Sequence, residues 1–404
     1  MSRASHLIPL ALSSRSIDTS PRTALRLGVT TFGTDGGESG IGRYARALIT
    51  RFAYPSTDHA IELIGAVNDQ SIFRHSGVPF HTIPDRWSKP LPNLAWHQVA
   101  LPGVARRNAY DVLFVPAGNR RLPGRMGCPV IGTVHDLSQI HVPGKYDGAR
   151  QFYARHVLPR LIRRLTHVVT VSRSSKHDIV EYAGVPEDRV TVIPNGVDLD
   201  RFRPREKDEA RADLDGIIGR DAPFLLYVSR LEHPGKNHVR LIRAFDLFKR
   251  QTGLPHRLVL AGPDWSGAEV IHAAAAKADY SGDILCTGFV HGRDLPSLYA
   301  AADALVFPSL YEGFGIPLLE AMATGTAVAA ARCSSLPEVG GDAALYFDPQ
   351  EPEEIAAAMS RIVSDDILRR QMVASGLSRA SEFSWERTAS LTLEVIREVA
   401  RDAA

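Results

Sequence analysis

The sequence predicts an α/β protein in which two Rossmann-like domains face a central cleft. Short apolar runs that fit buried parallel strands alternate with longer helical patterns along most of the chain. The chain has 404 residues, which is more than one hydrophobic core usually supports, so two domains are expected. The strand pattern restarts after the charged segment RPREKDEARADLD, and we therefore place the hinge near residue 205.

Each half of the chain contains six predicted strands. In the first half they are residues 25–32, 60–67, 112–116, 130–136, 167–172 and 190–196. In the second half they are residues 224–230, 256–262, 284–290, 304–309, 327–331 and 344–348. The predicted boundaries are a tail (1–24), a first domain (25–204), a second domain (205–383) and a C-terminal helix (384–404) that packs back on the first domain.

The composition excludes several classes of protein. With 44% hydrophobic and 23% charged residues, the chain has the usage of an ordinary globular protein. A formal net charge of +2 argues against a nucleic-acid partner. The cysteines Cys128, Cys286 and Cys333 lie far apart, which disfavours a zinc ribbon or a disulfide framework and fits a reducing cytoplasm. We expect neither a signal peptide nor a membrane-spanning helix.

Glycines follow the first predicted strand in the segment GTDGGESGIGRYARAL. Gly40 and Gly42 would let the backbone approach a ligand closely, and the amides at the start of the next helix would attract an anion. A tight strand-to-helix turn is the alternative interpretation. A dehydrogenase that uses NAD, a distant alternative for the whole protein, should carry GxGxxG, which this loop fits only loosely.

Three further polar residues follow predicted strands. His135 lies in TVHDLS, where it could hydrogen-bond a sugar hydroxyl or be a satisfied core histidine. Arg230 and Lys236 lie in YVSRLEHPGKN, and together they could bind a diphosphate, the alternative being a solvated basic loop. The segment HPGKN lacks the GxxxxGK[ST] spacing, so no P-loop for ATP hydrolysis is predicted.

The segment YEGFGIPLLEAMATGTAV contains two carboxylates, Glu312 and Glu320. We place Glu312 in the loop after a strand and Glu320 in the first turn of a helix that begins near Pro317, so both should face the cleft. Carboxylates can accept hydrogen bonds from paired hydroxyl groups of a sugar or a ribose, and the amides of residues 313–316 can bind phosphate. These groups together suit a nucleotide sugar, although one glutamate at a helix start can also merely complement the helix dipole.

The segment EGFGIPLLEAMATG resembles the glutamate-x7-glutamate motif of retaining glycosyltransferases with the GT-B fold, specifically glycosyltransferase family four. VTVSRSSKHDI and VTVIPNGVDLDRF resemble the end of that family's first domain, and SSLPEVGGDAALYFDP resembles its late second domain. The similarity covers residues 25–390. It implies a retaining hexosyltransferase in which the leaving diphosphate takes the acceptor's proton, without a metal or another cofactor. A non-catalytic protein of this fold would be expected to lose these residues.

The resemblance also implies a role for each matching residue. Glu312 would contact the transferred sugar and Glu320 the ribose, while Arg230 and Lys236 would neutralise the diphosphate. His135 would lie near the sugar's hydroxymethyl group. The predicted catalytic residues are His135, Arg230, Lys236 and Glu312. The predicted donor-binding residues are Gly40, Gly42, Val290, Gly313, Phe314, Gly315, Ile316 and Glu320.

The donor and the acceptor are less specified by the sequence. SSLPEVGGDAALYFDP and the proline after FGI are similar to bacterial mannosyltransferases of O-antigen and exopolysaccharide assembly that use GDP-mannose, and a UDP-sugar is the alternative donor. Backbone contacts near residues 288–290 are expected to select the base. The DLD triplets at 198–200 and 213–215 fall in the linker, so we interpret them as solvated turns rather than as metal ligands.

Residues 150–164 alternate arginines with aromatic and aliphatic residues. Such a basic amphipathic stretch can lie on an anionic membrane, where lipid-linked acceptors reside, or it can be an ordinary half-buried helix. The expected acceptor is therefore a glycan or a lipid-linked glycan. The expected location is the cytoplasm, either free or attached to the inner face of the plasma membrane.

Overall fold

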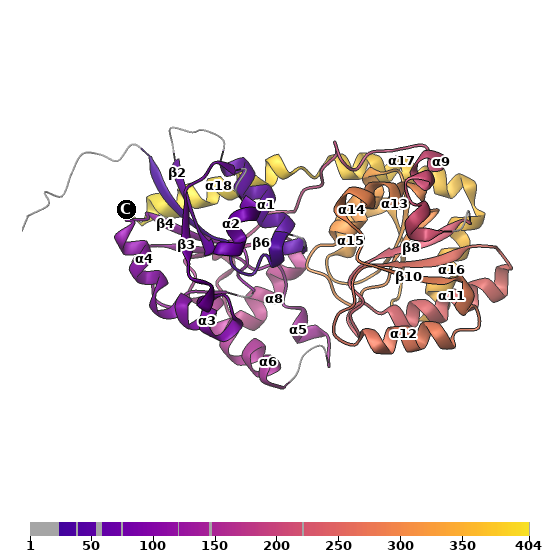
Figure 1. The fold of residues 1–404 in the computed structure, drawn as a ribbon, viewed down its shortest axis with the longest axis horizontal. Coiled ribbons are helices and arrows are strands. Elements are labelled where there is room, and N and C mark those ends of the chain that lie inside the picture. The colour runs from indigo at the N-terminus through magenta and orange to yellow at the C-terminus, as the bar shows by residue number, and fades with distance from the viewer. Residues whose placement is uncertain are drawn as a thin grey trace, which may run out of the picture.

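The computed structural model consists of two parallel α/β halves joined side by side (Figure 1). It describes residues 24–403, apart from 38, 54–58, 74–75, 120, 145–147 and 220–221. Nearly all of the predicted N-terminal tail, residues 1–24, lies outside the described residues. The predicted fold class, two Rossmann-like domains with parallel sheets, is confirmed.

The sheet of the first domain has seven strands in the order β3-β2-β1-β4-β5-β6-β7. All neighbouring strands are parallel, as in β1 with β2, where Leu25 pairs with His59. The strands are β1 (Leu25–Thr30), β2 (His59–Ala66), β3 (Phe80–Ile83), β4 (Val112–Val115), β5 (Val130–Thr133), β6 (His167–Thr170) and β7 (Val190–Val192). The apolar runs of β4 and β5 are buried throughout because helices cover both faces of the sheet.

Eight α-helices accompany this sheet in the described residues. They are α1 (Gly40–Phe52), α2 (Val67–Phe73), α3 (Pro90–Val99), α4 (Leu101–Arg107), α5 (Ser138–His141), α6 (Gly148–Phe152), α7 (Leu158–Arg163) and α8 (Arg173–Ala183). Helix α8 shows how local sequence sets the bounds: the Ser172 hydroxyl accepts a hydrogen bond from the Ser175 amide at the start, and Gly184 ends the helix with φ of +64°.

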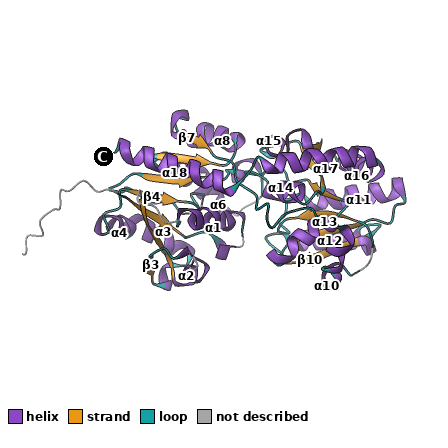
Figure 2. Ribbon diagram, turned by 90° about the horizontal axis from the view of Figure 1, so that it is seen from above, coloured by secondary structure: helices purple, strands orange, loops and turns teal. Residues whose placement is uncertain are grey.

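The sheet of the second domain has six parallel strands in the order β10-β9-β8-β11-β12-β13. They are β8 (Phe224–Val228), β9 (Arg257–Ala261), β10 (Ile284–Gly288), β11 (Ala304–Phe307), β12 (Ala327–Ala331) and β13 (Ala344–Phe347). Its helices are α9 (Lys207–Ala212), α10 (Asp215–Ile218), α11 (His238–Thr252), α12 (Ala268–Lys277), α13 (Leu295–Ala301), α14 (Ile316–Ala323), α15 (Leu336–Gly340), α16 (Pro352–Ser364) and α17 (Asp366–Ser381). Figure 2 shows helices on either side of the strands in both halves.

The last helix, α18 (Trp385–Asp402), leaves the second domain and lies along the first, beside α1 (Figure 1). Arg51 of α1 donates to the Glu386 carboxylate at 2.9 Å, and Gly196 lies so close to the Trp385 backbone that a β-carbon would sit 2.2 Å from the Trp385 nitrogen. The chain thus crosses between the domains twice. The domain boundaries remain our proposal, and these crossings support it.

Several elements differ from the predictions. Strand β3 was not predicted, because its sequence FHTI is only partly buried at the edge of the sheet and lacks a long apolar run. Strand β7 ends at Val192 rather than at residue 196, since proline follows at 194. None of the described helices is long and apolar enough to span a bilayer.

Candidate active site between the two domains

A cavity of about 740 Å³ lies between the carboxyl ends of the strands of the two sheets. The first domain contributes the loops after β1 and β5 together with the start of α1, and the second domain contributes the ends of β8 and β9 and the loop before α14. Ten of the twelve predicted site residues line it. They are Gly40, His135, Arg230, Lys236, Val290, Glu312, Gly313, Phe314, Gly315 and Ile316.

The start of α1 forms part of the wall on the first-domain side. The Ser39 hydroxyl caps the helix by accepting from the Gly42 amide at 3.1 Å, and Ser39 and Gly40 line the cavity. Gly42 does not line it. A β-carbon at Gly42 would lie 2.2 Å from the Thr34 carbonyl oxygen, so this glycine allows the turn to close rather than a ligand to approach.

His135 is a fixed, largely buried group in the cavity wall. Its Nε2 lies 2.8 Å from the Pro116 carbonyl oxygen, which only accepts, so this nitrogen carries a proton. The backbone amide of His135 donates to Asn119 Oδ1 at 2.6 Å, and the Tyr44 ring lies edge-on at 4.7 Å. His135 is therefore a hydrogen-bonded interior histidine that also lines the cavity, and its contact with a sugar hydroxyl stays a prediction.

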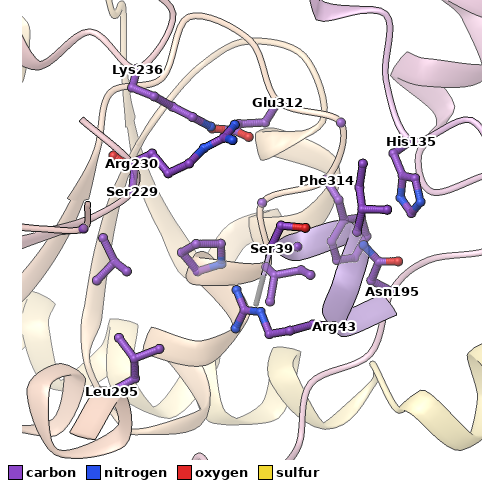
Figure 3. A pocket seen from close by; sticks show the side chains of 18 of the residues that line it. Ser39, Arg43, His135, Asn195, Ser229, Arg230, Lys236, Leu295, Glu312 and Phe314 are labelled. Atoms are coloured by element: carbon purple, nitrogen blue, oxygen red, sulfur yellow. The ribbon is translucent and has the colours of Figure 1, made fainter. Parts of the chain in front are cut away.

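The charged residues of the second domain lie together in the cavity. Lys236 Nζ is 2.6 Å from Glu312 Oε1, and both side chains are largely shielded, with exposed fractions of 18% and 15%. Arg230 is more open, stacks over the Trp265 ring at 4.6 Å and lies 3.3 Å from Glu232. Figure 3 shows Arg230, Lys236 and Glu312 grouped on one side of the cavity, with His135 and Asn195 on another. Such a group can hold an anion and a hydroxylated ligand at once.

The loop before α14 is built for a close backbone approach. Gly315, the N-cap of α14, has φ of +101°, which side chains other than glycine rarely adopt. The amides at the start of this eight-residue helix point toward its N-terminal end, which lines the cavity. The loop backbone is held from within the domain: Glu312 N donates to Ser334 Oγ at 3.0 Å, and Ser335 Oγ donates to the Glu312 and Phe314 carbonyls at 2.9 Å.

The prediction for Glu320 was wrong in its position. Because α14 begins at Ile316, Glu320 falls past the first turn, and its side chain is only 2% exposed. It accepts from Tyr299 Oη at 2.8 Å and forms an ion pair with Arg43 of the first domain. Glu320 lines a smaller pocket next to the main cavity, together with Arg43 and Arg46.

Some lining residues were not predicted. Arg43 and Arg46 follow the glycine loop in GIGRYAR, three residues apart on α1, and this spacing is the signal that could have pointed to them. Asn119 and Asn195 lie in loops after strands β4 and β7, where nothing in the local pattern marks them. Arg201 and Arg293 line the end of the cavity near Val290.

Neither the DLD triplets nor a cysteine adds chemistry to the cavity. Asp198 accepts from the Arg201 amide at 3.1 Å, and Asp213 pairs with Arg205 at 2.7 Å. Across the described residues, no three His, Cys, Asp or Glu side chains gather in a way that could hold a metal ion. Burial raises the pKa of the nearby Cys333 thiol to about 11, which leaves it protonated at neutral pH and unsuited as a nucleophile.

Two parallel sheets that face each other across a cavity at their carboxyl ends define the GT-B class of protein. Residues 39–201 match the model of Glycosyltransferase Family 4, and residues 213–379 match that of Glycosyl transferases group 1. The O-antigen chain mannosyltransferase B of Escherichia coli is 33% identical over 279 residues, which cover 69% of this chain and 72% of the relative. This chain therefore belongs to glycosyltransferase family 4 and is a glycosyltransferase.

Other comparisons agree with the family and the fold. The serotype-specific mannosyltransferase WbdA of Escherichia coli is 29% identical over 286 residues, covering 69% of this chain but 34% of WbdA, so the chain spans about a third of that protein. The crystal structure of HepE from Anabaena in complex with UDP and glucose has a TM-score of 0.73 at 19% identity, covering 93% of this chain and 100% of that one. At this identity the likeness shows the fold alone.

Proposed function

We propose that this glycosyltransferase transfers mannose from GDP-mannose, with retention of configuration, to a glycan or lipid-linked acceptor in bacterial surface polysaccharide synthesis. The observation that carries the proposal is the group formed by Arg230, Lys236 and Glu312 in a cavity shared with His135 of the other domain. Two cations suit a diphosphate, and the carboxylate and imidazole suit a sugar. The mannosyltransferase relatives from Escherichia coli support the choice of sugar.

The proposed donor would lie in the cavity, at the carboxyl ends of the strands of the second domain. Its diphosphate would be bound by Arg230, Lys236 and the amides before α14, and its sugar would lie between Glu312 and His135. As the bond to the leaving oxygen lengthens, negative charge grows there, and the two cations stabilise that charge more strongly than they stabilise the bound donor. The leaving diphosphate would accept the acceptor's proton on the same face of the sugar.

Two groups would exchange partners when the donor binds. The Lys236–Glu312 ion pair would open so that Lys236 meets phosphate and Glu312 meets sugar hydroxyls. Glu320 would meet the ribose only after the ion pair with Arg43 is released, since Tyr299 already donates to its other oxygen. Lys236 and Glu312 each keep a partner in this exchange, which compensates the desolvation cost of both charges.

A UDP-sugar is the second candidate donor, and the observation that favours it is the solved HepE structure, which holds UDP and glucose. Thermal shifts with GDP and UDP separate the two, because a nucleotide that binds only the folded protein raises its melting temperature. Stabilisation by GDP over UDP is expected. The reverse order would replace GDP-mannose by a UDP-sugar and leave the proposed reaction type in place.

The change Glu312→Ala is expected to abolish sugar transfer while GDP still binds. The variant loses the group proposed to contact the sugar, whereas Arg230 remains and Lys236 is freed from its ion pair for phosphate. GDP release from GDP-mannose, with methyl α-mannoside as a probe acceptor, measures turnover, and calorimetry measures GDP binding. Glu353→Ala, an exposed glutamate of α16, is the matched control. Turnover near that of the wild type in Glu312→Ala would contradict the assignment.

Turnover is expected to persist in excess EDTA, because Arg230 and Lys236 supply the positive charge at the diphosphate that a divalent cation supplies in other transferases. The measurement is the rate of GDP release before and after chelation, followed by addition of Mg²⁺ or Mn²⁺. If activity disappears with EDTA and returns with either metal, the proposed role of these two side chains is wrong.

The product is expected to keep the α configuration of the donor. In the proposed mechanism the leaving diphosphate and the acceptor share one face of the sugar, so the new bond forms where the old one broke. Proton NMR of the mannoside formed from GDP-mannose distinguishes the anomers. A β-linked product would exclude the same-face mechanism and would require a base on the opposite side.

We also propose that the first domain attaches to anionic membranes. In the stretch 150–164, Leu158, Leu161 and Ile162 are buried in the core and cannot insert into lipid. Cations remain at the surface, among them Arg155, Arg160 and Arg164, and Phe152 is 62% exposed. What supports attachment is therefore charge, about 1 kcal/mol for each basic residue near an anionic surface, rather than an apolar helix face.

The triple change of Arg155, Arg160 and Arg164 to glutamine is expected to weaken sedimentation with anionic vesicles at low salt, because three surface charges are lost. Arg163 is kept, since its Nε donates to the Ala183 carbonyl at 2.9 Å. The same change at Arg243, Arg361 and Arg370, exposed residues of the second domain, is the control for total charge. If the wild type ignores anionic vesicles at low ionic strength, a soluble glycan becomes the proposed acceptor.

A further inference from the structure

The residues on both sides of Glu312 are held by the opposite domain. Tyr311 and Gly313 belong to the loop between β11 and α14 of the second domain, yet each contacts the first domain directly. Tyr311 donates its phenolic hydrogen to Asp178 of α8. Gly313 lies against the turn after β5, where a β-carbon would sit 2.3 Å from the His135 carbonyl oxygen and 2.9 Å from Asp136 Cβ.

Asp178 is a buried carboxylate shared by two partners. Its Oδ2 accepts from Tyr311 and also lies 2.8 Å from His141 Nε2. The ring of His141 stacks on the ring of Tyr311 with centroids 4.6 Å apart and planes 6° from parallel. The hydroxyl and one face of Tyr311 are therefore both held by the first domain. Burial, reinforced by Asp178, raises the pKa of Tyr311, which keeps its phenol protonated and able to donate.

Helix α8 is fixed to the second domain at a further point. The carboxylate of Glu338 accepts from the backbone amides of Arg173 at 2.9 Å and Ser174 at 3.1 Å, which are the first two residues of α8. A carboxylate of one domain thus caps a helix of the other, where the helix has unpaired amides and a favourable dipole. Ser175 Oγ in turn donates to the His135 carbonyl at 2.9 Å, the same carbonyl that Gly313 approaches.

These contacts hold the loop that carries Glu312 from both domains. From the second domain, Ser334 and Ser335 hold the backbone at Glu312. From the first domain, Asp178 of α8 contacts Tyr311, and the His135 turn contacts Gly313. Tyr311 and Gly313 are the residues on either side of Glu312. Movement of one domain against the other would therefore move Glu312 relative to His135.

We propose that Asp178 is a positioning residue, which, through Tyr311, places the Glu312 carboxylate on the donor sugar when the two domains close. The inference rests on the proposed role of Glu312 and adds to it that the acceptor-side domain sets the geometry of the donor sugar site. Sugar transfer is thereby linked to closure, which also brings the acceptor to the site and limits reaction of the donor with water.

The test is the change Tyr311→Phe, which removes only the hydroxyl donor, together with Asp178→Ala, which removes its acceptor, and the double variant. Misplacement of a reacting group by about 1 Å costs up to about a hundredfold in rate, so kcat should fall by about tenfold to a hundredfold. GDP affinity should stay at its wild-type value, because Arg230 and Lys236 do not depend on this contact. The melting temperature should fall only modestly, because one buried hydrogen bond is lost. The double variant should be no slower than the slower single variant, since both changes remove one interaction.

Tyr110→Phe provides the matched control. Tyr110 also donates its hydroxyl to a carboxylate, that of Glu62 at 2.5 Å, but it lies just before β4, at the end of the strand away from the cavity. It should leave kcat unchanged.

Glu312→Ala is measured in parallel so that the two proposals can fail separately. If Glu312→Ala keeps its turnover, the proposed role of Glu312 is wrong. If Glu312→Ala is inactive but Tyr311→Phe turns over like the wild type, the positioning role of Asp178 is overturned and the proposed function stands. Equal losses of GDP affinity, stability and kcat in Tyr311→Phe, or additive losses in the double variant, would also overturn it.

Discussion

The close contact of two backbones, Gly313 in one domain and the His135 turn in the other, is the constraint on which the site depends. A β-carbon at position 313 would lie 2.3 Å from the His135 carbonyl, so only glycine permits the approach. This approach places Glu312 and His135 in the walls of one cavity, although 177 positions, 312 minus 135, separate them in the chain. The cavity, the Arg43–Glu320 ion pair between the domains and the packing of α8 all presuppose that the two sheets meet at this distance.

Both carboxylates that are proposed to bind the donor are paired with a cation. Glu312 is paired with Lys236, and Glu320 with Arg43. An uncompensated charge would be costly in such shielded positions, and each carboxylate proposed to bind the donor therefore has a cation as partner. A ligand that brings both phosphate and hydroxyl groups can replace both partners of the Lys236–Glu312 pair at once. A ligand with only phosphate or only hydroxyl groups would leave either Glu312 or Lys236 without a partner. The pair therefore favours a nucleotide sugar over free sugar or free phosphate.

The interface between the domains combines rigid and exchangeable parts. Helix α18 packs along α1, and the chain crosses between the domains near residue 205 and again before Trp385, so the domains are tethered at two points. Around the cavity the contacts are polar and local: Tyr311 with Asp178, Glu338 with the start of α8, and Arg43 with Glu320. Polar contacts of this kind can be broken and remade without disturbing either apolar core, which suits a cleft that must admit a donor and release a product.

The sequence by itself determined the parallel sheets, the number of domains and the loops of the cavity. Runs such as VLFV in β4 and AVAAA in β12 are apolar throughout because both faces of each sheet are covered, and this pattern is local. Ten predicted site residues line the cavity for the same reason: loops at the carboxyl ends of parallel strands necessarily share one edge of a sheet. The edge strand β3 escaped prediction because an edge strand is half exposed and carries no such run.

Only the tertiary structure decided which charges meet. The pairing of Glu320 with Arg43 joins residues 277 positions apart, and that of Tyr311 with Asp178 joins residues 133 positions apart. Neither pairing has a local signal, because a side chain's neighbours across a domain interface depend on how the two sheets dock. Local sequence patterns specify strands, helices and caps through contacts within a few residues, whereas the docking is set by the summed shape and charge of two surfaces. That is why Glu312 could be placed at the cleft from sequence, while the buried position of Glu320 could not.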